Sequence, residues 1–314
     1  MNERTIPTED LDVSALLTPY VQRKVHIRPD SWRRRVGFGA DAARIKRILC
    51  GFAILDEQLR AADRPRRSFA MVGAVGGVEA IGAAHIFKDL DTISVTDPDP
   101  AIRTQAVANI RDNVDPAITV EALAGAVHAP LALAGRTVDI IFANLLDGPI
   151  AAPAQAVGGN ATYPPIAGSG NDKMLNGYLL GLPYRFLRSV RGALTPGGMA
   201  LVLLGGRFYY GLFDRLAAAA GVRFEEVVSG LERQIDETNV VSGYAAAEGE
   251  DVLFDFYDLE KAQRSLHGDE HLPGGLLESV LTPWRLSARE ARRAISAGTA
   301  IGHTYHLLKA TPLG

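Results

Sequence analysis

The chain has 314 residues, of which 47% are hydrophobic and 22% charged, with a formal net charge of −3 at pH 7. This length and composition suit a globular protein with a substantial core, in one large or two small domains, and the charge gives no reason to expect a nucleic-acid partner. One cysteine, Cys50, excludes an internal disulfide, no apolar run reaches the roughly 18–20 residues of a membrane span, and the acidic N-terminus is no secretory signal, so we expect a cytoplasmic protein without a membrane partner.

Residues 1–67 form the first predicted segment, an N-terminal helical extension that could serve as a lid. Apolar residues recur at helical spacing from Leu11 to Val21 and again from Ala43 to Leu49. Two basic clusters, Arg33–Arg35 and Arg64–Arg67, fall in the same segment. A charge run of this kind is usually a solvated face; the alternative is that these clusters attract an acidic ligand.

The next segment, Phe69 to Asp99, predicts a strand, a glycine turn, a helix, a second strand and an acid. Glycines allow a ligand to approach the backbone closely, and the helix start beyond them offers unpaired N–H groups and positive potential. Asp97 ends the second strand, and an acid about 20 residues beyond such a turn suits the two hydroxyls of a ribose. The structural alternatives are a plain strand-to-helix turn and an acid that caps the next helix.

The sequence therefore predicts a cofactor that contains a nucleoside. The residues predicted to bind it are Gly73, Ala74, Gly76, Gly77, Asp97, Pro98 and Asn144. Two families share this layout, the dinucleotide-binding oxidoreductases and the class I S-adenosylmethionine methyltransferases, and the glycine turn alone does not separate them.

Later segments favour the methyltransferases. An apolar strand, Val138–Phe142, directly precedes Asn144. The run Ala143–Pro149, ANLLDGP, resembles the A-N-I-L-x-G-P motif of the ribosomal protein L11 methyltransferase family, and Asp97–Pro100 is similar to that family's D-x-D-P. The resemblance covers Phe69 to Gln234, about half of the chain.

The resemblance implies S-adenosylmethionine as the cofactor and an α/β fold. That fold is a doubly wound, mostly parallel, seven-stranded sheet. Two positions depart from the family's first motif, D-x-G-x-G-x-G: Met71 replaces the acid and Val75 replaces the middle glycine. The acid usually helps to orient the methionine end of the cofactor, so how that end is held is left open.

The alternation of strands and helices over residues 68–233 predicts a Rossmann-like core with helices on both faces of a parallel sheet. The predicted strands are Phe69–Val72, Thr92–Thr96, Ile118–Leu123, Val138–Ala143, Met199–Leu204 and Phe224–Gly230. Gly73, Asp97 and Asn144 then follow the carboxyl ends of their strands, where ligands bind in such sheets.

The last two strands of the class I fold form a hairpin. Here the last strand is predicted within residues 301–314, far from the sixth. Residues 234–300 are therefore predicted to be an inserted substrate-cap subdomain, which includes a capped helix at Ser287–Ser296.

Asn144 and Leu145 are the predicted catalytic residues. The resemblance implies amino-group methylation and gives that role to Asn144 alone. An amine nucleophile also suits the residues themselves, because the side-chain carbonyl of Asn144 and the backbone carbonyl of Leu145 can accept N–H bonds and aim the nitrogen lone pair at the methyl group. The alternative is an asparagine that is favoured simply by a strand-to-loop turn.

Substrate contacts are predicted on both sides of the sixth strand. The glycine- and proline-rich segment Ala151–Leu180 is interpreted as a substrate lid that includes Tyr163, the alternative being a mobile insertion. Glu232, Asp236 and Glu237 follow the sixth strand, and a guanidine or lysine-like substrate would need such carboxylates. The alternative for these acids is a solvated turn.

The histidines predict no metal site. His267–His271 has suitable residue types but reads as a polar surface turn. His303 and His306 stand at odd spacing in the last strand, so they point to opposite faces and cannot share a metal ion.

The function that the sequence favours is an S-adenosylmethionine-dependent N-methyltransferase acting on an amine or guanidine of a small molecule. One alternative is a protein lysine or α-amine N-methyltransferase. From other classes, an NAD-dependent oxidoreductase and a non-catalytic binding protein stay open, and Met71 and Val75 favour the latter. The substrate, the acceptor atom and the oligomeric state, with a homodimer among the alternatives, are left open.

Overall fold

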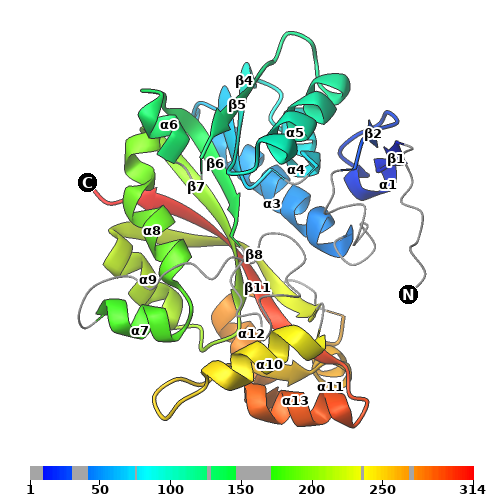
Figure 1. Cartoon of the computed structure of the whole chain (residues 1–314), viewed down its shortest axis with the longest axis vertical. Helices are drawn as coiled ribbons and strands as arrows, with labels where there is room; N and C mark the ends of the chain where they lie inside the picture. The colour runs from blue at the N-terminus through cyan, green and yellow to red at the C-terminus, as the bar shows by residue number, and fades with distance from the viewer. Residues whose placement is uncertain are drawn as a thin grey trace. The chain divides into compact units, whose positions relative to one another are not determined.

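The computed structural model describes residues 10–29, 42–74, 76–125, 129–145, 171–234, 237–268 and 272–314. Contacts divide the chain into two compact units. Unit one is Met1–Asn144 with Ser189–Leu201, and unit two is Leu145–Arg188 with Val202–Gly314. The four segments predicted from the sequence have different boundaries and stay a prediction. Figure 1 labels the elements.

Unit one is built on parallel strands (Figure 1). Strand β3 (Ser68–Val72) pairs in parallel with β4 (Thr92–Asp97) on one side and β6 (Val138–Asn144) on the other, and β4 pairs in parallel with β5 (Thr119–Ala124). The first part of β7 (Leu194–Gly206) lies beyond β6. The order β5-β4-β3-β6-β7 is that of a doubly wound sheet, which confirms the predicted core.

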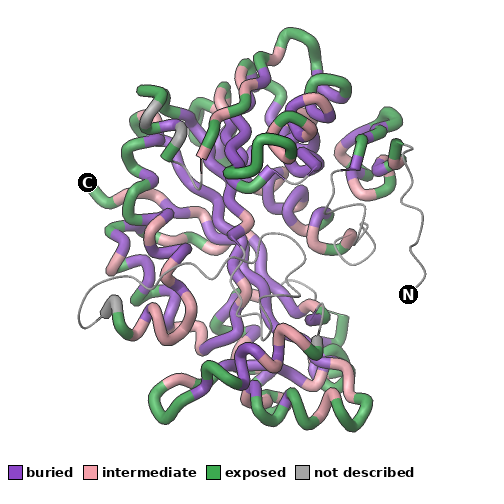
Figure 2. Tube along the Cα trace, in the orientation of Figure 1, coloured by how far each residue is buried: buried purple, intermediate pink, exposed green. Residues whose placement is uncertain are grey.

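Helices cover these strands. They are α3 (Ala42–Ala61), α4 (Val78–Ile86), α5 (Pro100–Asn113) and α6 (Ala129–Leu133), with a 3-10 turn, η2, at Val190–Ala193. Phe52 of α3 packs edge-on against Phe69 of β3 and Phe142 of β6, with ring centroids 5.7 and 5.1 Å apart. Both helices and strands are therefore buried where they meet, as Figure 2 shows by colour.

The N-terminal extension is helical in α3 but not over the first apolar repeat. Only α1 (Ser14–Leu17) is helical there, between the paired strands β1 (Leu11–Asp12) and β2 (His26–Ile27). Helix α1 ends at Leu17, and the next residue, Thr18, has an extended ψ of 137°. The reason is Pro19, because a residue before proline is disfavoured in the helical region.

Unit two contains an antiparallel hairpin. Strand β11 (Ile301–Pro312) pairs antiparallel with β8 (Val222–Arg233) over almost its whole length, and the second part of β7 is its other neighbour. Strand β9 (Phe256–Asp258) pairs with the start of β11, and β10 (Arg285–Leu286) pairs with β9.

The remaining helices follow residue 170 in the chain. They are α7 (Asn171–Gly177), α8 (Gly181–Ser189), α9 (Leu212–Ala220), α10 (Glu237–Ala247), α11 (Leu259–Ser265), α12 (Gly274–Leu281), η3 (Thr282–Trp284) and α13 (Ala288–Ser296). The predicted capped helix is confirmed: Ser287 and Glu290 form a reciprocal capping box at the start of α13. Among the described residues, no helix has the length and hydropathy of a membrane span.

Candidate functional site

Three predicted site residues lie at the ends of three adjacent strands. Val72, the last residue of β3, is paired with the residue before Asp97 on β4 and with the residue before Asn144 on β6. Gly73 directly follows Val72, so it is level with both. Neighbouring strands are about 4.8 Å apart, so the register brings Gly73, Asp97 and Asn144 together at the carboxyl edge of unit one.

The glycine turn has left-handed backbone at Gly73, Gly76 and Gly77, with φ values of +80°, +74° and +75°. Gly73 is exposed, and a Cβ added there would meet no atom within 4 Å. A Cβ on Gly77 would lie 2.9 Å from Ile110 Cγ1 and 3.1 Å from the carbonyl oxygen of Ala106, both on α5. Gly73 therefore leaves open space for a ligand, whereas Gly77 is required by the close packing of α4 and α5.

Asp97 supports the glycine turn directly. Its carboxylate is buried and accepts the backbone N–H of Ala74 at 3.2 Å and that of Asp99 at 2.9 Å. An ionised carboxylate has about four lone-pair sites, so both oxygens keep capacity for a further donor. Helix α5 is capped by Asp99, which accepts from Ala101 and Ile102. The capping alternative therefore does not apply to Asp97.

Asn144 is half-buried at the last position of β6, and Leu145 after it is buried. Pro98, next to Asp97, is exposed. Met71, which stands where the family has an acid, is buried inside β3 between Val95 and Phe142 of the neighbouring strands.

Some predicted site positions lie outside the residues that the structure describes. They are the part of the motif after Leu145, Tyr163 of the predicted lid, Val75 and Asp236. Glu237 is in helix α10, but its side chain is not described.

Glu232 belongs to a buried polar cluster in unit two. Its Oε1 lies 3.1 Å from His303 Nε2, and Arg207 Nη2 lies 2.8 Å from the same nitrogen. Arg207 Nε also donates to Gln234 Oε1 at 2.9 Å, and its guanidinium stands 5.3 Å from the ring centroid of Tyr244. Sequence reasoning missed Arg207 and Gln234. The available signal was a charged residue directly after the two glycines that end the apolar strand β7.

His306 has a different set of neighbours, as the odd spacing predicts. Its Nδ1 lies 2.9 Å from Glu226 Oε2, and its Nε2 lies 3.0 Å from Thr304 Oγ1. Burial raises the pKa of Glu226, but the hydrogen bond and charge of His306, with the N–H of Gly274 and the hydroxyl of Ser229, outweigh burial and leave that pKa lowered. This pair joins β8, β11 and the start of α12.

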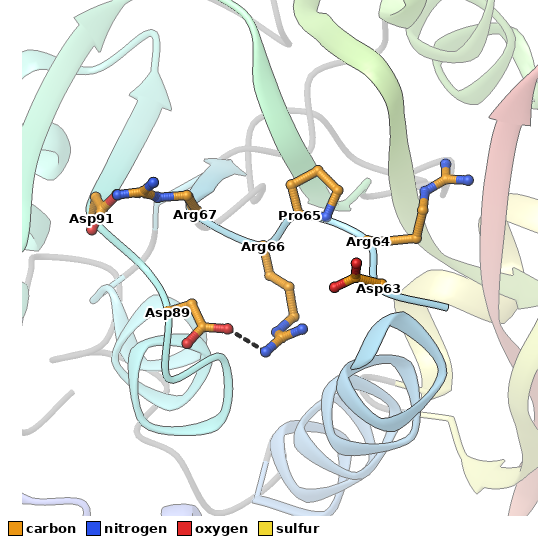
Figure 3. A pocket seen from close by; sticks show the side chains of 7 residues that line it. All are labelled: Asp63, Arg64, Pro65, Arg66, Arg67, Asp89 and Asp91. Atoms are coloured by element: carbon orange, nitrogen blue, oxygen red, sulfur yellow. Dashed lines mark hydrogen bonds and ion pairs between the residues drawn. The ribbon is translucent and has the colours of Figure 1, made fainter. Parts of the chain in front are cut away.

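A cavity of about 600 Å³ is at the opposite edge of unit one. Its lining residues are Asp63, Arg64, Pro65, Arg66, Arg67, Asp89 and Asp91, which precede β3 and β4. Figure 3 shows Arg66 directed at Asp89, and Arg67 reaches Asp91 at 2.6 Å. These arginines are paired with aspartates at the amino edge, away from the glycine turn.

Comparisons with known proteins give structural neighbours only. No family model and no curated protein matches the sequence. A SAM-dependent methyltransferase from Agrobacterium tumefaciens has a TM-score of 0.42 at 14% identity, over 90% of this chain and 67% of that one. A putative methyltransferase from Thermoplasma acidophilum has a TM-score of 0.37 at 12% identity, over 80% and 70%. A ribosomal protein L11 methylase from Lactobacillus delbrueckii subsp. bulgaricus has a TM-score of 0.34 at 16% identity, over 57% and 69%. Likeness at this level does not transfer an activity.

The carboxyl edge of unit one combines an exposed glycine, a buried carboxylate and an amide on adjacent strands. A carboxylate accepts hydroxyl donors, and an amide carbonyl accepts N–H donors. Within the described residues, no group of three or more histidine, cysteine, aspartate and glutamate side chains could hold a metal ion. The described residues at this edge are thus suited to holding and orienting polar ligands.

Proposed function

We propose that this protein is an S-adenosylmethionine-dependent methyltransferase that acts on nitrogen. One observation carries the proposal: Gly73, Asp97 and Asn144 occupy level positions at the carboxyl ends of β3, β4 and β6. Ligands of open α/β sheets bind at this edge. In this proposal the glycine turn and Asp97 bind the nucleoside of the cofactor, and the amide of Asn144 binds the amine that is methylated.

The residues present fit the cofactor. Open space beside Gly73 would receive it, and the N-terminus of α4, a helix of 9 residues, follows the glycine turn. Asp97 would accept the two ribose hydroxyls through its remaining lone pairs, while its bonds to Ala74 and Asp99 hold its carboxylate in place. When bound, the cofactor supplies a methyl group that is already activated, so the protein mainly has to position the acceptor.

The end of the sheet favours a methyltransferase over an NAD-dependent oxidoreductase. A doubly wound dinucleotide-binding sheet continues with parallel strands. Here the neighbour of β7 is β11, which forms an antiparallel hairpin with β8. A terminal hairpin of this kind is typical of the class I methyltransferase fold that the motifs resemble.

Nitrogen is the proposed acceptor because of Asn144. Its amide carbonyl and the carbonyl of Leu145 accept N–H bonds and direct the remaining lone pair of an amine toward the methyl group. The insertion between β8 and β11 forms its own apolar core from α10, α13 and β9. The acceptor that we infer is an amine or guanidine of a small molecule, as the sequence favours.

Isothermal titration with S-adenosylhomocysteine, with NAD as the control, tests the cofactor. Micromolar affinity for the first compound alone is expected, and binding of NAD alone, or of neither compound, would overturn the proposal. Transfer of labelled methyl groups to arginine and other small amines then tests the acceptor. Asn144→Ala should lower kcat by about 100-fold, the usual effect of misplacing a reacting group. An unchanged rate would remove Asn144 from the mechanism.

A further inference from the structure

A second cavity, of about 370 Å³, lies wholly within unit two. Its lining includes Tyr178, Tyr209, Phe254, Asp255 and Arg285. Four lining side chains, Asp255 among them, are acidic, and Arg285 is the basic one. Aromatic rings and an excess of carboxylates in one cavity are the chemistry that recognises an organic cation.

Asp255 is the most informative residue of the cavity. It is 7% exposed and stands between Phe254 and Phe256, whose rings are fully buried. Its backbone N–H donates to the carbonyl of Arg207 at 2.9 Å, which fixes the chain at this point. Among the described residues no hydrogen bond reaches its carboxylate, and the nearest cationic group, Arg285 Nη1, is 3.8 Å away.

The surroundings of Asp255 disfavour its negative charge. Glu278 and Glu248 act on it with like charge, and Arg285 is the opposing cation. Burial, the largest cause, raises the pKa of Asp255 to about 6. Within the described part of the chain, the carboxylate has only a long ion pair with Arg285, so a donor that enters the cavity would supply the hydrogen bond that this carboxylate lacks.

Aromatic side chains form the wall beside this carboxylate. The rings of Tyr178 and Tyr209 stand edge to face with centroids 6.0 Å apart, and Tyr178 meets Phe254 at 5.9 Å. The quadrupole of an aromatic ring attracts a cation that lies over the ring face. The described side chains do not gather as a metal site would require. A metal ion therefore fits this cavity less well than an organic cation.

Arg285 occupies part of the cavity without closing it. Its side chain is 44% exposed, whereas the side chain of Asp255 is 11% exposed. The guanidinium is also beyond hydrogen-bond distance of the carboxylate. Arg285 thus competes weakly for Asp255 and can move into solvent when a ligand donates to that carboxylate.

We propose that this cavity of unit two is a binding site for an organic cation, a primary alkylammonium or a guanidinium group, which donates to Asp255 and lies against Tyr178 and Tyr209. The inference does not rest on methyl transfer, because it concerns binding alone. Failure of cofactor binding and failure of cation binding are therefore separate results.

Titration of the full chain with n-butylammonium chloride tests the site, with n-butanol as the neutral control of similar shape. The ammonium should bind at pH 8 and the alcohol should not. Asp255→Asn should weaken binding by about 10–100-fold, the range for a lost hydrogen bond to a charged group. Equal binding of the two probes, or an unchanged affinity in Asp255→Asn, would overturn the proposal.

Further variants keep the test independent of how Asp255→Asn folds. Arg285→Gln removes the competing cation and should tighten n-butylammonium binding, whereas Tyr209→Leu should weaken it. Glu260→Gln on α11 is the matched control, because that glutamate is 81% exposed and is outside the cavity. Weaker n-butylammonium binding in Arg285→Gln would contradict the site. An equal loss of affinity in Glu260→Gln and Tyr209→Leu would contradict it as well.

The dependence on pH identifies the carboxylate. The charged and titratable groups that act on Asp255 are Arg285, Glu278, Glu248, Tyr178 and Tyr257. A cation needs the ionised form, so affinity in the wild-type chain should fall about tenfold between pH 8 and pH 5. Asp255→Asn should remove this dependence. A wild-type affinity that is constant over this range would exclude Asp255 as the partner.

Discussion

At the scale of single residues, two aspartates of one turn have different tasks. Asp97 holds the glycine turn through Ala74 and keeps lone pairs toward the carboxyl edge. Asp99, two positions later, is exposed and caps α5. Identical side chains so close together give a matched pair for separating ligand recognition from helix stability.

Asp97→Asn should weaken S-adenosylhomocysteine binding by about 10–100-fold, because an amide oxygen replaces a charged acceptor of two hydroxyls. Asp99→Ala should leave that affinity unchanged and lower the free energy of unfolding by about 1 kcal/mol, the usual cost of a lost cap. Titration calorimetry and urea unfolding measure the two effects. Equal losses of affinity in both variants would mean that the turn, not the Asp97 carboxylate, determines binding.

At the scale of elements, α5 connects the N-terminal segment to the glycine turn. Asn109 of α5 is buried, donates to the carbonyls of Arg28 and Gly76 at 3.0 and 3.1 Å, and accepts the N–H of Arg28 at 2.9 Å. One turn later, Asn113 donates to the carbonyl of His26 at 2.7 Å. Both asparagines fasten the segment that contains β2, but only Asn109 reaches the turn.

Asn109→Leu should therefore weaken S-adenosylhomocysteine binding, whereas Asn113→Leu should not. Both should lower the free energy of unfolding by about 1–3 kcal/mol, because each removes hydrogen bonds to backbone carbonyls that are at least partly buried. Calorimetry of the two variants, each checked for folding by circular dichroism, compares them at equal loss of stability. If Asn113→Leu weakened binding as much, the effect would come from general destabilisation and Asn109 would not be a positioning residue.

The elements also show where sequence patterns were sufficient. Strands β3, β4 and β6 were predicted to within one residue at each end. Each is a short run rich in apolar and β-branched residues, as is typical of buried parallel strands. The predicted strand Met199–Leu204 is only the later part of β7, which begins at Leu194. Local patterns do not show that a strand can continue through Gly197, whose φ is +80°.

Long-range partners were harder to predict than elements. Arg207 is far in the sequence from its partners Gln234 and His303. Glu232 meets His303 only because β8 pairs with β11. The three residues of unit one's carboxyl edge were predictable because each directly follows an apolar run. The cluster in unit two was not, because it depends on the register of a hairpin with an inserted subdomain.

At the scale of the whole molecule, two units share strand β7 but present different chemistry. Unit one offers a carboxyl edge suited to a nucleoside. Unit two contains the acidic, aromatic cavity proposed for a cation. The net charge of −3 over the chain does not show this local excess of carboxylates. The excess should make the free energy of unfolding depend on pH.

Asp255 should make the whole chain less stable as the pH rises from about 4 to about 6. Its pKa is raised from 3.8 to about 6 by burial, so in this range the folded chain binds more protons than the unfolded one, and the free energy of unfolding decreases with pH. The lowered pKa of Glu226 acts in the opposite sense, because its stabilisation is lost as the pH falls. Asp255→Asn should therefore raise the free energy of unfolding at pH 8 by about 1–3 kcal/mol, and this gain should vanish near pH 4. Urea unfolding at both pH values measures the difference, with Glu260→Gln expected to match the wild type. A variant less stable than the wild type at pH 8 would show that the ionised Asp255 carboxylate stabilises the fold, and the cavity would then hold no uncompensated charge for a cation to neutralise.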